Sequence, residues 1–192
     1  MKLSPMLLWL LVACESGKSA PAPTSRVEAV SAKRSDDSAA SFCDVAPVGD
    51  AAPLFRLPTL AGPAPAETKG ARWINVWATW CPPCVEELPR LSELVETLRK
   101  GGTEVALQLV SVDASDEAIA DFAKAHPEVK SSPRIGALAD LEPWLASLGL
   151  DKGATLPVHV FVRADGKVAC ARTGAVRDSD LPAIRKLLSG TR

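Results

Sequence analysis

Residues 73–84 read WINVWATWCPPC. The first six, 73–78, are mostly apolar or β-branched and predict a buried strand. Beyond Cys84, apolar residues recur at steps of three and four and predict a helix that buries one face: Val85, Leu88, Leu91, Val95 and Leu98. The two cysteines of this CxxC motif therefore lie where a strand passes into a helix.

This position favours reactive cysteine chemistry. A helix N-terminus presents free N–H groups and the positive end of the macrodipole, so it favours an anion. The thiolate is the reactive form of cysteine, and Cys81 is placed to be held in that form. Pro82 and Pro83 suit the first turn of a helix, where a missing N–H costs nothing.

The segment WATWCPPC resembles the thioredoxin fold, and within it the TlpA/ResA-like branch of extracytoplasmic thiol–disulfide oxidoreductases. The resemblance extends over residues 53–188. Pro89 matches the proline that kinks the active-site helix of the family, and Glu87 matches an acidic residue of this branch. Leu156-Pro157 before a strand resembles the cis-proline loop that faces the CxxC. The resemblance implies a three-layer α/β/α sandwich with a mixed central sheet.

The resemblance also assigns roles to residues. Cys81 is the expected nucleophile, which attacks a partner disulfide, and Cys84 is expected to resolve the mixed disulfide. Glu87 lies one helical turn beyond Cys84 and is expected to exchange a proton with it, although an exposed helix-surface glutamate is the alternative. A substrate groove is expected from five residues: Trp80, Pro82, Pro83, Leu156 and Pro157.

Two polar residues in the predicted strands, Asn75 and His159, differ from the residues that the family has at these positions. Asn75 stands where thioredoxin itself has a buried aspartate, and an amide cannot shuttle a proton, which favours Glu87 for that role. His159 stands where the family commonly has a small polar residue. A buried, hydrogen-bonded histidine is the favoured interpretation, and a functional role is the alternative.

Alternative functions of the CxxC have less support in the sequence. A structural zinc site needs four ligands, whereas the chain has two histidines and no second CxxC, so no metal site is predicted. A copper chaperone that uses Cys81 and Cys84 as soft ligands is the alternative function, although no methionine- or histidine-rich motif supports it. A thiol oxidase or isomerase on the same fold is a further alternative, because sequence does not show the redox direction.

The N-terminus predicts export. Residues 1–13 have a basic start and a short apolar run, which is typical of a signal peptide. Leu11-Val12-Ala13-Cys14 resembles a bacterial lipobox and predicts a lipid on Cys14. Residues 14–41 are rich in Ala, Ser and Pro and predict a flexible tether. Glu15 leans weakly towards the outer membrane by family analogy.

Residues 42–192 form the expected thioredoxin-like domain. Within it the pattern predicts strands at 54–57, 105–112, 158–163 and 167–173, the second of them buried on both faces. Helices are predicted to begin at Asp113, Asp140 and Asp178, whereas the segment 127–137 supports a strand poorly. Cys43 and Cys170 are expected to form a disulfide in an oxidising compartment, as some family members have an extra one in this region; a free thiol is the alternative.

The sequence thus predicts a lipid-anchored, periplasm-facing enzyme of the bacterial cell envelope that reduces disulfides in exported proteins. By family resemblance the partners are proteins of cytochrome c or copper-oxidase assembly, and a membrane thiol reductase supplies electrons. No cofactor beyond the dithiol is implied. The net charge of −1 does not indicate a basic surface that would bind nucleic acid, and nothing in the sequence indicates an oligomer.

Overall fold

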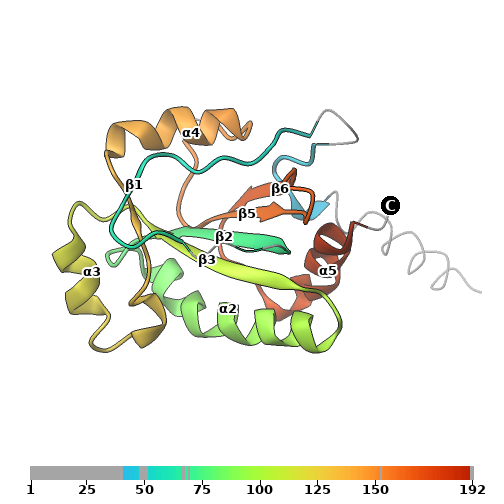
Figure 1. Ribbon diagram of the computed structural model, residues 1–192, viewed down its shortest axis with the longest axis horizontal. Helices are drawn as coiled ribbons and strands as arrows, with labels where there is room; N and C mark the ends of the chain where they lie inside the picture. Colours follow the sequence, from blue (N-terminus) through green and yellow to red (C-terminus); the bar gives the residue numbers. More distant parts are fainter. Residues whose placement is uncertain (1–40, 48–51, 66–67, 69, 152, 191–192) are drawn as a thin grey trace, which may run out of the picture. The chain divides into compact units, whose positions relative to one another are not determined.

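The computed structural model describes residues 41–47, 52–65, 68, 70–151 and 153–190 (Figure 1). The predicted signal peptide, the lipidation site Cys14 and the tether up to residue 40 lie outside the described residues. None of the helices in the described part combines the length and the apolar character that a membrane crossing requires.

The centre of the domain is a six-stranded mixed sheet with the order β1-β4-β3-β2-β5-β6. Strands β2, β3 and β4 are parallel, and β1, β5 and β6 run antiparallel to their neighbours. The bounds are β1 Leu60–Ala61, β2 Ala71–Trp77, β3 Val105–Ser111, β4 Arg134–Ile135, β5 Val158–Val162 and β6 Val168–Thr173.

Helices cover both faces of this sheet. Their bounds are α2 Pro82–Lys100, α3 Asp116–Phe122, α4 Leu141–Ser147 and α5 Leu181–Ser189, with short 3-10 turns at η2 Pro127–Val129, η3 Leu138–Asp140 and η4 Asp178–Asp180. Helices α2 and α5 lie against one face and α4 against the other (Figure 1). The α/β/α sandwich with a mixed sheet is therefore confirmed.

Strand β2 passes through the middle of the core. Trp73, Ile74, Val76 and Trp77 have no exposed surface, as the apolar run predicts. Helix α2 buries the apolar stripe that its periodicity predicts, including Leu88, Leu91, Val95 and Leu98. Because both elements are anchored in the core, the junction between them, which holds the CxxC, is fixed at the carboxyl end of β2.

The predicted strand at 54–57 is wrong. Only an isolated bridge between Leu54 and Lys167 occurs there, and the strand β1 lies farther on, paired with β4. Pro53 and Pro58 bracket the segment, and proline has no N–H to give to a sheet ladder. The short strand β4, which the sequence supported poorly, is present.

The prediction that the strand at 105–112 is buried on both faces is also wrong in part. Leu107 and Leu109 are only half-buried. Strand β4 pairs with β3 at a single position, Ser111 with Arg134, so most of that edge of β3 has no strand beside it in the described part of the chain. Leu107 and Leu109 are two residues apart and point to the same face, so that face of β3 is only partly covered.

Candidate active site

The CxxC motif forms the first turn of helix α2. Cys81 is the N-cap residue, and its carbonyl accepts a hydrogen bond from the Val85 N–H at 3.0 Å. Pro82 and Pro83 occupy the first helical positions and are exposed. Because neither proline has an N–H, Cys84 supplies the first backbone donor that a helical residue can offer to the Cys81 sulfur.

The two cysteines differ in accessibility. Cys81 has 5% of its surface exposed and Cys84 has none, and the two are joined by a disulfide, so the structure shows the oxidised site. The slightly more exposed of the two residues is Cys81, which the sequence predicts to be the nucleophile. Cys84 is placed where only Cys81 and the protein interior can reach it.

A buried carboxylate holds the loop in front of the CxxC. Asp113, 2% exposed, accepts hydrogen bonds from the Thr79 N–H at 3.0 Å, the Thr79 hydroxyl at 2.7 Å and the Ser111 hydroxyl at 2.6 Å. The sequence placed Asp113 at a helix start, but Ser115 caps α3 by accepting from the Ala118 N–H. The position of an acidic residue directly after a buried strand is the signal that could have revealed this role.

The expected substrate groove has mixed exposure. The peptide bond Leu156–Pro157 is cis, and Pro157 is buried while Leu156 is half-buried. Trp80, directly before Cys81, leaves 66% of its surface in water. A large exposed aromatic ring beside the CxxC is a surface on which a partner chain can bury apolar area.

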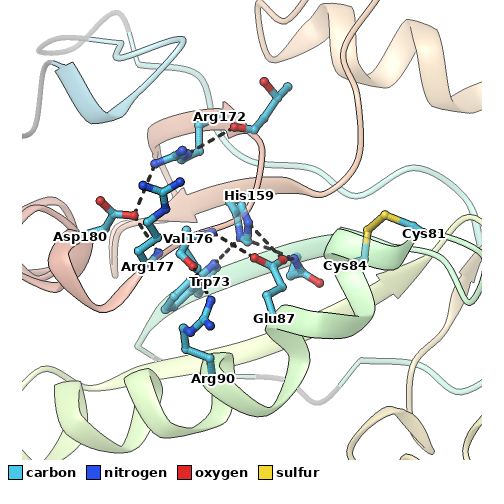
Figure 2. A network of polar contacts seen from close by, with 12 residues as sticks. Trp73, Cys81, Cys84, Glu87, Arg90, His159, Arg172, Val176, Arg177 and Asp180 are labelled. Atoms are coloured by element: carbon cyan, nitrogen blue, oxygen red, sulfur yellow. Dashed lines mark hydrogen bonds and ion pairs between the residues drawn. A yellow bond between two sulfur atoms is a disulfide. The ribbon is translucent and has the colours of Figure 1, made fainter.

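Glu87 lies in the interior behind Cys84 (Figure 2). Its side chain is 1% exposed, so the alternative of a surface glutamate is wrong. Oε1 accepts from the Asn75 Nδ2 at 2.8 Å, and Oε2 accepts from the Val176 N–H at 3.0 Å. A buried carboxylate requires such donors to replace water.

His159 is buried and hydrogen-bonded, as the favoured interpretation predicts. It has no exposed surface, and its Nδ1 accepts from the Trp73 Nε1–H at 3.0 Å. The structure also brings its Nε2 to 3.3 Å from Glu87 Oε1, which the sequence reasoning missed. The signal was present, because Asn75 and His159 are polar residues within two apolar strands that the fold pairs side by side.

The structure contains a second disulfide, between Cys43 and Cys170, far from the CxxC in sequence. Around it, Asp44 Oδ2 accepts from the Thr173 N–H at 2.7 Å, and Val45 forms an isolated bridge with Ala171. The segment before β1 is thereby attached to β6. In the described part of the chain, no three His, Cys, Asp or Glu side chains gather as a metal site.

Comparison with known proteins places this geometry in a family. The profile of the Redoxin family matches residues 47–188, about three quarters of the chain. The chain belongs to the Redoxin family. The match includes the CxxC, Glu87 and Pro157.

Individual relatives narrow the assignment. The thioredoxin-like protein YneN of Bacillus subtilis (strain 168) is 33% identical over 120 residues, which cover 58% of this chain and 71% of that protein. The thiol-disulfide oxidoreductase ResA of Oceanobacillus iheyensis is 27% identical over 139 residues, covering 67% of this chain and 66% of that protein. The solved structure of a thioredoxin-related protein from Neisseria meningitidis serogroup B is 28% identical with a TM-score of 0.54, and covers 69% of this chain and 100% of that chain.

These matches and the fold together show a TlpA/ResA-like protein with a thioredoxin fold. The chain is an enzyme of the thiol–disulfide oxidoreductase class. The matched region spans between 66% and 71% of the length of the two curated relatives.

Proposed function

We propose that the Cys81–Cys84 dithiol reduces disulfide bonds in exported proteins. The observation that carries the proposal is the arrangement at the start of α2: Cys81 is 5% exposed, Cys84 is fully buried, and a buried carboxylate, Glu87, lies one turn behind. This arrangement separates the sulfur that meets the partner from the sulfur that completes the reaction.

The reaction then proceeds in two displacements. The Cys81 thiolate attacks one sulfur of the partner disulfide, forming a mixed disulfide and releasing a partner thiolate that takes a proton from water. The Cys84 thiol gives its proton to Glu87, and its thiolate attacks the Cys81 sulfur. The second partner thiolate leaves and is protonated in turn. Two electrons pass to the partner, and the enzyme is left with the Cys81–Cys84 disulfide.

Substrate contacts follow from the same geometry. Trp80, Pro82 and Pro83 present exposed apolar surface next to Cys81. Leu156 and Pro157 belong to the loop that precedes β5, and we assign them with these three residues to the groove that receives the partner peptide. The Cys43–Cys170 disulfide has a structural role in this account, because it attaches the segment before β1 to β6.

The cellular setting is part of the proposal. Residues 1–13 act as a signal peptide, Cys14 carries the lipid, and residues up to 41 tether the domain to a membrane of the cell envelope, facing the periplasm. A membrane thiol reductase returns electrons to the disulfide. The partners are proteins of cytochrome c or copper-oxidase assembly, which need reduced cysteines.

Insulin reduction tests the chemistry. The purified protein, supplied with dithiothreitol, is expected to accelerate insulin precipitation, and Cys81→Ser is expected to abolish the acceleration. Cys84→Ser is expected to retain a trapped mixed disulfide, because the resolving thiol is missing. Tight, stoichiometric Cu(I) binding by the reduced protein without insulin reduction would instead support a copper chaperone, and refolding of scrambled ribonuclease without net reduction would support an isomerase.

A further inference from the structure

Glu87 and His159 form a buried pair between helix α2 and strand β5 (Figure 2). The His159 Nε2 lies 3.3 Å from Glu87 Oε1, and the two side chains are 0% and 1% exposed. Asn75 Nδ2 reaches the same oxygen at 2.8 Å, and the Val176 N–H reaches Oε2 at 3.0 Å. Three nitrogen atoms, from β2, β5 and the loop after β6, thus surround one carboxylate.

Trp73 determines which nitrogen of His159 carries the proton. An indole N–H only donates, so His159 Nδ1, which receives it at 3.0 Å, must present a lone pair. In the neutral imidazole the hydrogen is then on Nε2, the atom that faces Glu87. The ring is therefore an acceptor towards Trp73. Its Nε2 is buried without a hydrogen-bond partner in the described oxidised structure, and the acceptor that it faces is Glu87 Oε1 at 3.3 Å.

Arginine side chains lie near the pair on α2 and β6, whereas the facing group on β2 is neutral. On α2, Arg90 Nη1 donates at 3.2 Å to the carbonyl of Val176, the residue whose N–H binds Glu87. On β6, Arg172 stands opposite His159 in the ladder, and its Nη1 lies 3.8 Å from Asp180 Oδ2 at the end of η4. On β2 the facing group is the neutral amide of Asn75.

We propose that His159 is a positioning residue of the redox centre, which holds Glu87 as the proton acceptor of Cys84 by donating its Nε2 hydrogen to Glu87 Oε1. The inference rests on the proposed function and extends it to a residue outside the helix. A charge-assisted N–H···O bond stabilises an ionised carboxylate more strongly than a neutral one. His159 therefore holds the carboxylate in place as the acceptor of the Cys84 proton.

The contacts of the two Glu87 oxygens indicate which of them accepts the Cys84 proton. Oε1 accepts from Asn75 and also faces His159 Nε2 at 3.3 Å, whereas among the described residues Oε2 accepts from the Val176 N–H. The proton from the Cys84 Sγ–H is accepted on Oε2, while Oε1 keeps both donors as the carbonyl oxygen of the neutral acid. The Cys84 thiolate then forms a bond with the Cys81 sulfur, the mixed disulfide breaks, and Glu87 passes the proton to solvent.

The tautomer can be measured without any activity. The chain has only two histidines, His126 and His159, so the ¹⁵N spectrum of the histidine-labelled protein contains two imidazoles, and His126→Gln assigns them. We expect the His159 signals of a ring protonated on Nε2 with a bare Nδ1, in both redox states. A ring protonated on Nδ1 overturns the inference.

The kinetic test compares two substitutions at one site. His159→Phe keeps a ring but removes the donor, and His159→Gln keeps an amide N–H donor together with a carbonyl acceptor for Trp73. We expect release of a preformed Cys81 mixed disulfide to be about tenfold slower in His159→Phe at pH 7, the size of one charge-assisted hydrogen bond. His159→Gln and the control His126→Gln are expected to remain within about twofold of the parent protein.

Two further readouts separate positioning from simple packing. The deficit of His159→Phe is expected to shrink near pH 10, where a thiol ionises without a base, and to vanish in a Glu87→Gln background, because His159 acts through Glu87. A deficit that is independent of pH or additive with Glu87→Gln overturns the inference, as does a normal rate in a folded His159→Phe. Failure of the parent protein to reduce insulin would instead overturn the proposed function. The tautomer measurement would still test whether His159 carries its hydrogen on the nitrogen that faces Glu87.

Discussion

Glu87 is a carboxylate with 1% of its surface exposed, and an ionised carboxylate in such a place needs donors to replace water. The helix periodicity of α2 places it beside Cys84 but does not say whether that side is covered. The structure covers it with β2, β5 and the loop that carries Val176. Its chemistry therefore depends on segments far from it in sequence.

The role of Glu87 predicts a specific kinetic defect. In Glu87→Gln the amide keeps the size of the side chain but cannot accept the Cys84 proton, so resolution of the mixed disulfide is expected to slow by about 10²-fold. Attack by Cys81 on the partner is expected to change little. Stopped-flow fluorescence of the two steps measures both rates.

Glu86→Gln is the matched control, because Glu86 is the exposed neighbour on the same helix. It is expected to leave both rates unchanged. Equal slowing by Glu86→Gln and Glu87→Gln would contradict a specific proton acceptor.

At the scale of elements, the junction between β2 and α2 is held by Asp113 at the end of β3. Its carboxylate collects three donors from Thr79 and Ser111, so the loop that carries Trp80 and Cys81 is tied to the neighbouring parallel strand. The parallel pairing of β2 and β3 brings the two carboxyl ends together.

We expect Asp113→Asn to lower the free energy of unfolding by about 2–3 kcal/mol, because the amide turns a donor towards groups that are themselves donors. Urea denaturation of the oxidised protein measures the change. Asp121→Asn is the control, since Asp121 is an exposed partner of Lys124 and its loss is expected to change stability by less than about 0.5 kcal/mol. Equal effects would show that Asp113 does not hold the loop.

The elements with strong periodicity were predictable from sequence. Strand β2 and helix α2 have continuous apolar patterns that end in clear turn signals, and the structure has them where the pattern predicts. The segment 54–57 failed because its apolar residues lie between prolines that deny it a ladder. Strand β4 has only two residues, so its existence depends on partners and not on its own pattern.

The site was predictable to the same degree. Cys81, Cys84 and Glu87 lie within one short stretch, so spacing and resemblance were enough to propose them as site residues. His159 and Asp113 act through contacts across the sheet, at separations that no local pattern encodes. The polar residues inside apolar strands marked these positions in the sequence. Their partners could be identified only from the way β2 pairs with β5 and with β3.

At the scale of the whole molecule, the Cys43–Cys170 disulfide closes a loop of 127 residues. The chain-entropy model gives about 5 kcal/mol of stabilisation for so long a loop. The double variant Cys43→Ala/Cys170→Ala is expected to lose about that free energy of unfolding in urea while it still reduces insulin. A loss below about 1 kcal/mol would contradict a stabilising role, and loss of insulin reduction by a folded variant would assign the second disulfide to the redox cycle.

The reduction potential of the Cys81–Cys84 pair tests the central claim most directly. The purified protein is equilibrated in glutathione and dithiothreitol buffers, and alkylation with mass measurement follows this pair separately from Cys43–Cys170. A potential near the thioredoxin range, about −270 mV, is the result expected of a reductant for exported proteins. A potential near about −120 mV would mean that the pair is an oxidant, and the proposed direction of electron flow would be wrong.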